Sequence, residues 1–181
     1  MNNLSHQCKR LFDAQRTSMR LVLNAIDEIA NHTLGVDSSR TMIETLSQYL
    51  AGYAHYKHHA IEETYLLTPE FSRTSPQALK ACHLLTAQHR SLYSPCFWWS
   101  NQAASVSCQA LQQFIVDYRA HLELEEALIW GQFLNAIRPI QFGEAAFALA
   151  QLDDPLAGYK PDVSTGALCN AIKRSPHYMM Q

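Results

Sequence analysis

Residues 107–137 read SCQALQQFIVDYRAHLELEEALIWGQFLNAI, and their apolar spacing predicts one long helix that is closed by Pro139. Gaps of three and four residues alternate along one side of this helix, through Leu111, Phe114, Tyr118, His121, Glu125, Leu128 and Gln132. A helix in a bundle turns such a side toward the core. The polar residues His121 and Glu125 therefore belong to the predicted buried side.

Three further segments carry the same helical period. The first is capped by Ser5 and ends before Gly35, with a core side made of Cys8, Phe12, Gln15, Met19, Val22, Ile26 and Ile29. The second runs from Ser38 or Ser39 to about Leu67, where Pro69 stops it, with a core side of Ile43, Leu46, Leu50, Ala54, His58, Glu62 and Tyr65. Polar side chains again interrupt both apolar sides.

The third predicted helix opens at Ser75-Pro76, since proline in a first turn loses no hydrogen bond. Its core side comprises Leu79, Cys82, Leu85, His89, Tyr93 and Cys96. Pro95 lies inside this pattern, so we expect a kink or an end just past His89. Four long helices with short links predict an all-α, up-down four-helix bundle over residues 1–140.

Residues 141–181 are expected to form a C-terminal extension that packs across one end of the bundle. Residues 143–152 and 164–174 have helical character, and the chain between them contains Asp154-Pro155, Gly158 and Pro161. Phe97-Trp98-Trp99 could line a gas channel or form a homodimer patch, but packing against this extension is the favoured interpretation.

Composition excludes several classes of protein. The chain has 181 residues, a net charge of -2, 6 Gly and 7 Pro, which disfavours a turn-rich β sandwich or a disordered segment. The chain has no cluster of basic residues that would indicate binding to nucleic acid or to an anionic membrane. The first residues lack the apolar core of a signal peptide, and no apolar stretch has membrane-spanning length, so neither a signal peptide nor a membrane span is expected. Five widely spaced cysteines without a paired motif favour a reducing, cytoplasmic setting.

Two related motifs indicate metal chemistry. HHAIEE at 58–63 and HLELEE at 121–126 both contain His-x-x-x-Glu, which places an imidazole and a carboxylate one helical turn apart on one side. Buried carboxylates are unfavourable unless compensated, and a cation on the bundle axis compensates them. Hydrogen-bonded core polar residues without a metal are the alternative interpretation.

The donor types also restrict the metal. Imidazole and carboxylate ligands without thiolate favour iron, manganese or zinc. Five or six side chains exceed the needs of one tetrahedral zinc, so two iron ions are the preferred prediction, with manganese or zinc as alternatives. No Glu-x-x-His is present, which disfavours a ferritin-like site.

Residues 8–137 resemble the hemerythrin-like, His-His-Glu cation-binding proteins, because of the two motifs and the Gln-His-Arg at 88–90. The resemblance implies five metal ligands, with the two carboxylates as bridges: His58, Glu62, His89, His121 and Glu125. The family places a histidine after an acidic residue on the first helix, but this chain has Ala14-Gln15. Gln15 would be a weak ligand, and His55 could replace it.

Residues near the motifs are expected to have supporting roles. Tyr65, Tyr93 and Tyr118 could hydrogen-bond a bound oxygen species or a ligand imidazole, or could simply fill the core. His59, Glu63 and Glu126 are one position off the core side, and solvent contact or pairing along the helix is expected for them rather than metal ligation.

The resemblance implies a protein that binds or senses a small ligand such as oxygen or nitric oxide. An oxidase, or an enzyme that handles peroxide or nitric oxide, is the first alternative. A structural bundle with a degenerate or zinc-filled site is the second.

Overall fold

The computed structural model describes residues 3–31, 36–103 and 106–175, and every regular element in these ranges is helical. The first long segment is α1 (Asn3–Asn31) and the third is α4 (Pro76–Gln102). The second is α2 (Val36–Tyr49), continued by the π-helical segments η1 (Leu50–His59) and η2 (Glu62–Leu66). The fourth is α5 (Cys108–Glu125), continued by the π-helical segment η4 (Glu126–Gln132).

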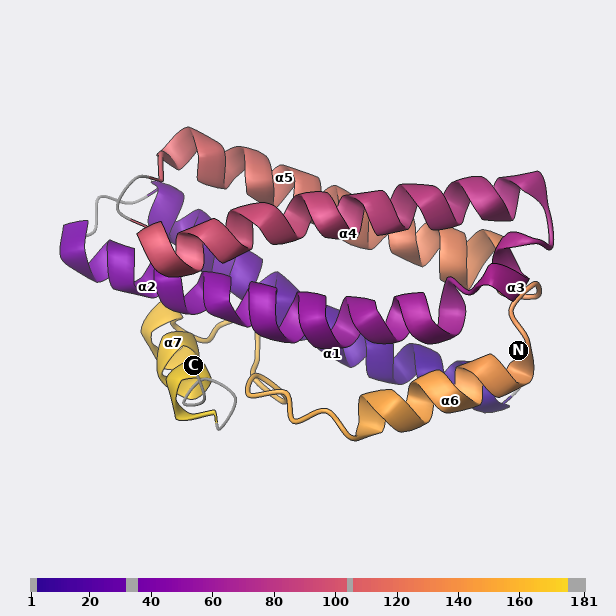
Figure 1. The fold of residues 1–181 in the computed structure, drawn as a ribbon. Helices are drawn as coiled ribbons and strands as arrows, with labels where there is room; N and C mark the ends of the chain where they lie inside the picture. The colour runs from indigo at the N-terminus through magenta and orange to yellow at the C-terminus, as the bar shows by residue number, and fades with distance from the viewer. Residues whose placement is uncertain (1–2, 32–35, 104–105, 176–181) are drawn as a thin grey trace.

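The four long segments run alongside one another, and consecutive segments point in opposite directions (Figure 1). Both α2 and α5 pack against α1 and against α4. A short helix, α3 (Pro69–Ser72), links the second segment to α4. This arrangement agrees with the predicted order of helices.

Side-chain caps fix several helix starts. Ser75 Oγ accepts from the Ala78 backbone N–H at 3.0 Å, and Ser107 Oγ accepts from that of Ala110 at 3.1 Å. The predicted cap at Ser5 is wrong, because α1 is already helical at Asn3 and buries Ser5 within its first turns. The predicted end at Gly35 lies outside the described residues.

Two predicted helix ends also differ from the structure. The third helix does not end after His89, because α4 continues through Pro95 to Gln102. Burial of Leu92 and Cys96, on either side of the missing backbone donor, provides packing that stabilises this part of α4. The fourth helix ends at Gln132 rather than residue 137, since the chain turns there and buries Phe133.

The C-terminal helices lie along the side of the molecule, not across one end as expected. The first of them, α6 (Pro139–Ala150), begins four residues before the predicted start and packs against α1 and η2. The second, α7 (Thr165–Arg174), matches the predicted range and packs against α2 and α1. Figure 1 shows α6 and α7 beside opposite ends of α1.

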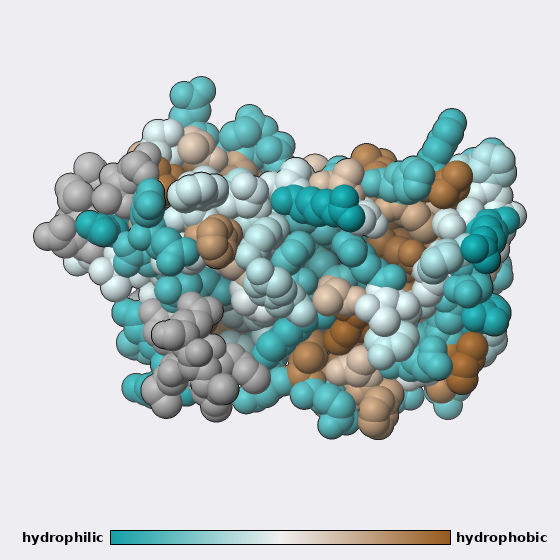
Figure 2. Space-filling model, viewed as in Figure 1, coloured by the Kyte–Doolittle hydropathy of each residue, from teal (hydrophilic) through white to brown (hydrophobic). Residues whose placement is uncertain are grey.

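The surface is mixed in character. On the face shown in Figure 2, hydrophobic residues lie in small separate groups among hydrophilic ones. Trp98 is 56% exposed, so the expected packing against the C-terminal extension does not hold for it. Trp99 packs on Phe114 of α5 and against the apolar cluster to which Leu168 of α7 also belongs. Within the described ranges, no helix has the length and apolar character needed to cross a bilayer.

Candidate metal centre

A layer of buried polar side chains separates two apolar clusters. One cluster contains Met19 and Leu46, the other contains Phe12 and Leu66, and each of the four long segments contributes to both. Between the clusters, all four segments supply buried polar residues at one level. We call this set the polar layer: Gln15, Arg16, His58, His59, Glu62, His89, His121 and Glu125.

The π-helical segments position much of this layer. Their i→i+5 hydrogen bonds include the Leu67 N–H to the Glu62 carbonyl at 2.9 Å and the Phe133 N–H to the Leu128 carbonyl at 2.8 Å. Such turns are wider than α-helical turns, so adjacent side chains diverge less around the axis. Both His58 and His59 are consequently buried, although they are consecutive.

Hydrogen bonds at Nδ1 orient three imidazoles. The Nδ1 of His58 donates to Gln15 Oε1 at 2.7 Å, and the Nδ1 of His89 donates to Glu63 Oε1 at 2.6 Å. The Nδ1 of His121 donates to Oε1 of Gln88 at 3.1 Å, so all three rings are held by side-chain oxygens. When Nδ1 carries the proton, a neutral ring keeps its lone pair on Nε2, which is then free to bind a metal.

The three Nε2 atoms approach the two buried carboxylates. His89 Nε2 lies 3.3 Å from Glu62 Oε2, and His121 Nε2 lies 3.7 Å from Glu125 Oε2. The Nε2 of His58 lies 3.9 Å from Oε1 of Glu125. These three nitrogens, both oxygens of Glu62 and Oε2 of Glu125 have no hydrogen-bond partner among the described residues. Buried polar atoms require a partner, and a cation could partner all six.

Donor atoms form two groups compatible with metal binding. One group contains His58, Glu62 and Glu125, and the other contains His59, His89 and His121. Within each group the donor atoms lie within 4.8 Å of one another. Each of the five ligands implied by the sequence resemblance therefore belongs to one group or the other.

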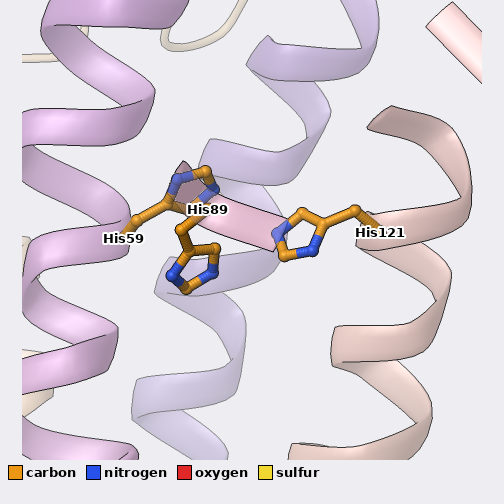
Figure 3. Close-up of side chains that lie close together, drawn as sticks. All are labelled: His59, His89 and His121. Carbon is orange, nitrogen blue, oxygen red and sulfur yellow. The ribbon is translucent and has the colours of Figure 1, made fainter. Parts of the chain in front are cut away.

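His59 is the first residue that sequence reasoning misjudged. It is 2% exposed rather than in solvent, and both of its ring nitrogens lack a partner in the described structure. Its ring stacks on His89 with a centroid separation of 4.0 Å and an interplanar angle of 5°. Figure 3 shows His121 facing these two rings from the opposite side. The spacing His55, His59, Glu62, Leu66 was the available signal, since it repeats a gap of four, three and four.

Arg16 is the second residue of the polar layer that was not predicted from the sequence. Its side chain is 1% exposed, and its guanidinium donates to Glu125 Oε1 from Nη2 and, at 2.9 Å, from Nε. Its Nη1 also donates to Glu126 Oε2 at 2.5 Å. The signal was the spacing Phe12, Arg16, Met19, which places Arg16 on a core-facing side of α1.

Burial and charge give the two carboxylates of the layer opposite pKa shifts. Burial, together with the charge of Glu125, raises the pKa of Glu62 to about 7. Burial also acts to raise the pKa of Glu125, but the Arg16 guanidinium and His58 outweigh it and hold this pKa below its ordinary value. Glu125 thus has the Arg16 guanidinium as its positive partner, whereas the positive charge facing Glu62 comes from His89, whose Nε2 lies 3.3 Å away.

The pKa values of two imidazoles are also shifted in opposite directions. Burial lowers the pKa of His121 to about 4, so this ring is neutral at physiological pH. Burial acts in the same direction on His89, but Glu62 and Glu63 outweigh it and raise its pKa to about 9. The His89 proton therefore compensates Glu62 when no other cation is bound.

The two suggested additional ligands make contacts of another kind. Gln15 is buried and uses its side-chain oxygen to hold His58, which makes it a support for a ligand. His55 is half-buried and stacks on Tyr93 with ring centroids 4.2 Å apart.

The three tyrosines make other contacts than those expected. The hydroxyl of Tyr118 donates to the sulfur of Met19 at 3.8 Å, and Tyr93 shares a hydrogen bond with Tyr56 at 2.5 Å. Tyr65 packs against the apolar cluster around Phe12 and Leu66. These placements agree with core-filling roles and give no phenol proton to a ligand of the polar layer.

A surface pocket of about 510 Å³ reaches the polar layer between α4 and α5. Gln88 and His121 are among its lining residues, together with Pro95, Trp99 and Asp117. Because Gln88 also holds the His121 ring, this pocket brings solvent-side space next to the candidate centre.

Compared with known protein families, with curated proteins and with solved structures, the chain gives no match.

Proposed function

We propose that this chain is a hemerythrin-like four-helix bundle that binds a non-haem metal in its polar layer. The proposed ligands are His58, Glu62, His89, His121 and Glu125. The observation that carries the proposal is the set of six unpartnered donor atoms, supplied by three ring nitrogens and two carboxylates in one buried layer. Metal ligands of this kind normally have their other ring nitrogen held by an oxygen, as these three histidines do.

Iron is the metal that we propose to test first, with manganese and zinc as alternatives. Imidazole and carboxylate donors suit all three metals. The sequence-based number of two iron ions stays a prediction, and the presence of two donor groups is compatible with it.

We further propose that the centre binds or senses a small ligand such as oxygen or nitric oxide. A bound iron ion would supply a redox-active position at which such a ligand attaches. The chain contributes exclusion of water, through the apolar clusters on both sides, and fixed ring orientation.

Metal retention tests the centre. We expect protein from iron-supplemented cells to keep metal through desalting, and His89→Ala to lower the affinity at least about tenfold, since it removes a donor. His83→Ala is the matched control, because His83 lies on the same helix but is exposed. Elemental analysis of the three proteins gives the result. A wild type without metal, or equal retention in His89→Ala, would sink the proposal.

Reaction with small molecules separates binding from catalysis. The anaerobically reduced, iron-loaded protein is mixed with oxygen, nitric oxide or peroxide and followed by absorption. We expect a stable band that disappears when the gas is removed. Repeated consumption of the added molecule would support the enzyme alternative instead.

A further inference from the structure

The guanidinium of Arg16 occupies the polar layer as a built-in cation. Two of its nitrogens donate to Oε1 of Glu125, and its Nη1 lies 2.5 Å from Glu126 and 3.2 Å from Asp13. Glu126 and Asp13 are 42% and 47% exposed, whereas Arg16 and Glu125 are almost fully buried. The buried part of this network is thus the Arg16–Glu125 pair.

The two oxygens of Glu125 lie in different environments, because Arg16 donates to only one of them. Oε1 receives the Arg16 donors and is also the oxygen 3.9 Å from His58 Nε2. Oε2 has no hydrogen-bond partner and lies 3.7 Å from His121 Nε2. The guanidinium charge therefore acts on the His58 side of the layer, and the His121 side remains open for a metal ion.

The charges of the polar layer lead to the same conclusion, that only one side is left for a metal ion. The fully buried carboxylates of the layer are Glu62 and Glu125, and Arg16 already offsets one of them. One divalent ion together with the guanidinium leaves a single excess positive charge, whereas two divalent ions leave three. Uncompensated charge between two apolar clusters is strongly unfavourable, because the local dielectric is low.

We propose that Arg16 takes the place of one metal ion, so that the centre holds a single divalent ion. The ion would be bound by His89, His121, Glu62 and Oε2 of Glu125, while Arg16 positions Glu125 through Oε1. This inference rests on the proposed metal centre and replaces the sequence-based number of two ions with one.

Anaerobic titration with manganese(II) or iron(II) tests the role of Arg16. We expect one ion per chain in the wild type and two in Arg16→Leu, in which a second ion binds at least about a hundredfold more tightly than in the wild type. Arg16→Lys keeps the charge and should remain at one ion. Arg20→Leu is the matched control, because Arg20 lies one turn further along α1 and is exposed.

Each outcome has a distinct meaning. A wild type that binds two ions, or a folded Arg16→Leu that binds only one, would overturn the inference. A wild type that binds none would instead contradict the proposed function, so the two failures are distinguishable. If Arg16→Leu does not fold by circular dichroism, the neutral Arg16→Gln replaces it in the titration.

Electron paramagnetic resonance of the manganese(II) protein gives a second measurement that needs no variant. We expect the spectrum of isolated ions at saturation. A spectrum of a spin-coupled pair in the wild type would overturn the single-ion inference.

Discussion

Gln15 shows how one residue can serve a site without being a ligand. Its amide oxygen holds the His58 ring at Nδ1, and its side chain is buried. With His58 among the five proposed ligands, Gln15→Leu is expected to lower metal affinity about 10- to 100-fold, because the ring loses its orientation. A single ion bound by His89, His121, Glu62 and Glu125 alone would leave the affinity unchanged in this variant. Isothermal titration measures the affinity. Gln7→Leu, at an exposed position of α1, is the control. Equal affinity in both variants would argue against a supporting role.

The cysteines differ in reactivity because they differ in exposure. Only Cys108 is exposed among the five free thiols. Burial raises the pKa of Cys8 to about 12, and that of Cys82 and of Cys169 to about 11, which leaves almost no thiolate at pH 8. We predict one fast-reacting thiol per chain with Ellman's reagent and four that react only after unfolding. Cys108→Ser should abolish the fast phase. A fast phase of two or more thiols would contradict this prediction.

The candidate ligands could be read from the sequence because they repeat the helical period of their apolar neighbours. His121 and Glu125 continue a spacing set by Leu111 and Phe114, and any helix that buries those two must bury the others. Arg16 could not be read in this way. A long cationic side chain is normally placed in solvent, and only the position of Glu125 on another helix shows that it has a buried partner.

At the level of the elements, the π-helical segments explain a further limit of sequence reasoning. Adjacent residues of an α-helix lie about 100° apart, so the core side drawn through His58 and Glu62 leaves out His59, which fits only a second spacing through His55 and Leu66. The wider turns of η1 bring both into the polar layer. Such turns depend on tertiary packing, and the α-helical period used for the sequence does not represent them.

Alanine substitutions at two glycines are predicted to change the stability of the fold in opposite directions. Gly52 lies within η1, and a Cβ there would meet nothing within 4 Å. We predict that Gly52→Ala stabilises the fold by about 0.5–1 kcal/mol, because alanine reduces the backbone entropy of the unfolded chain. Gly158 has a φ of +82°, so Gly158→Ala should destabilise by about 1 kcal/mol. Thermal unfolding of both variants measures the shifts. A change of the same sign in both would refute this account.

At the scale of the whole molecule, the C-terminal helices are part of the packed structure. Phe142, Ala145 and Leu149 of α6 belong to the same apolar cluster as Phe12, whose ring lies 4.8 Å from that of His58. The predicted boundary at residue 140 falls inside α6 rather than in a linker. The sequence beyond Pro139 lacks a long apolar period, so its part in the core was not predictable from pattern alone.

Paired substitutions on α6 test whether these helices unfold with the rest. Leu149 is 2% exposed, and we predict that Leu149→Ala costs about 2–5 kcal/mol through the cavity it leaves. Phe147→Ala, at a side chain 72% exposed, should change stability by less than about 0.5 kcal/mol. Chemical denaturation monitored by circular dichroism compares them. A Leu149→Ala protein with an unchanged main transition would indicate that α6 is a separate unit.

The Arg16–Glu125 contact also bears on the order of events during biosynthesis. Many small metal proteins remain unfolded until the metal arrives, because metal binding supplies their folding free energy. Here α1 brings its own positive charge to Glu125, and the proton on His89 serves Glu62 in the same way. In the proposed metal centre, folding would therefore not wait for the ion, and metal delivery would be a step separate from folding.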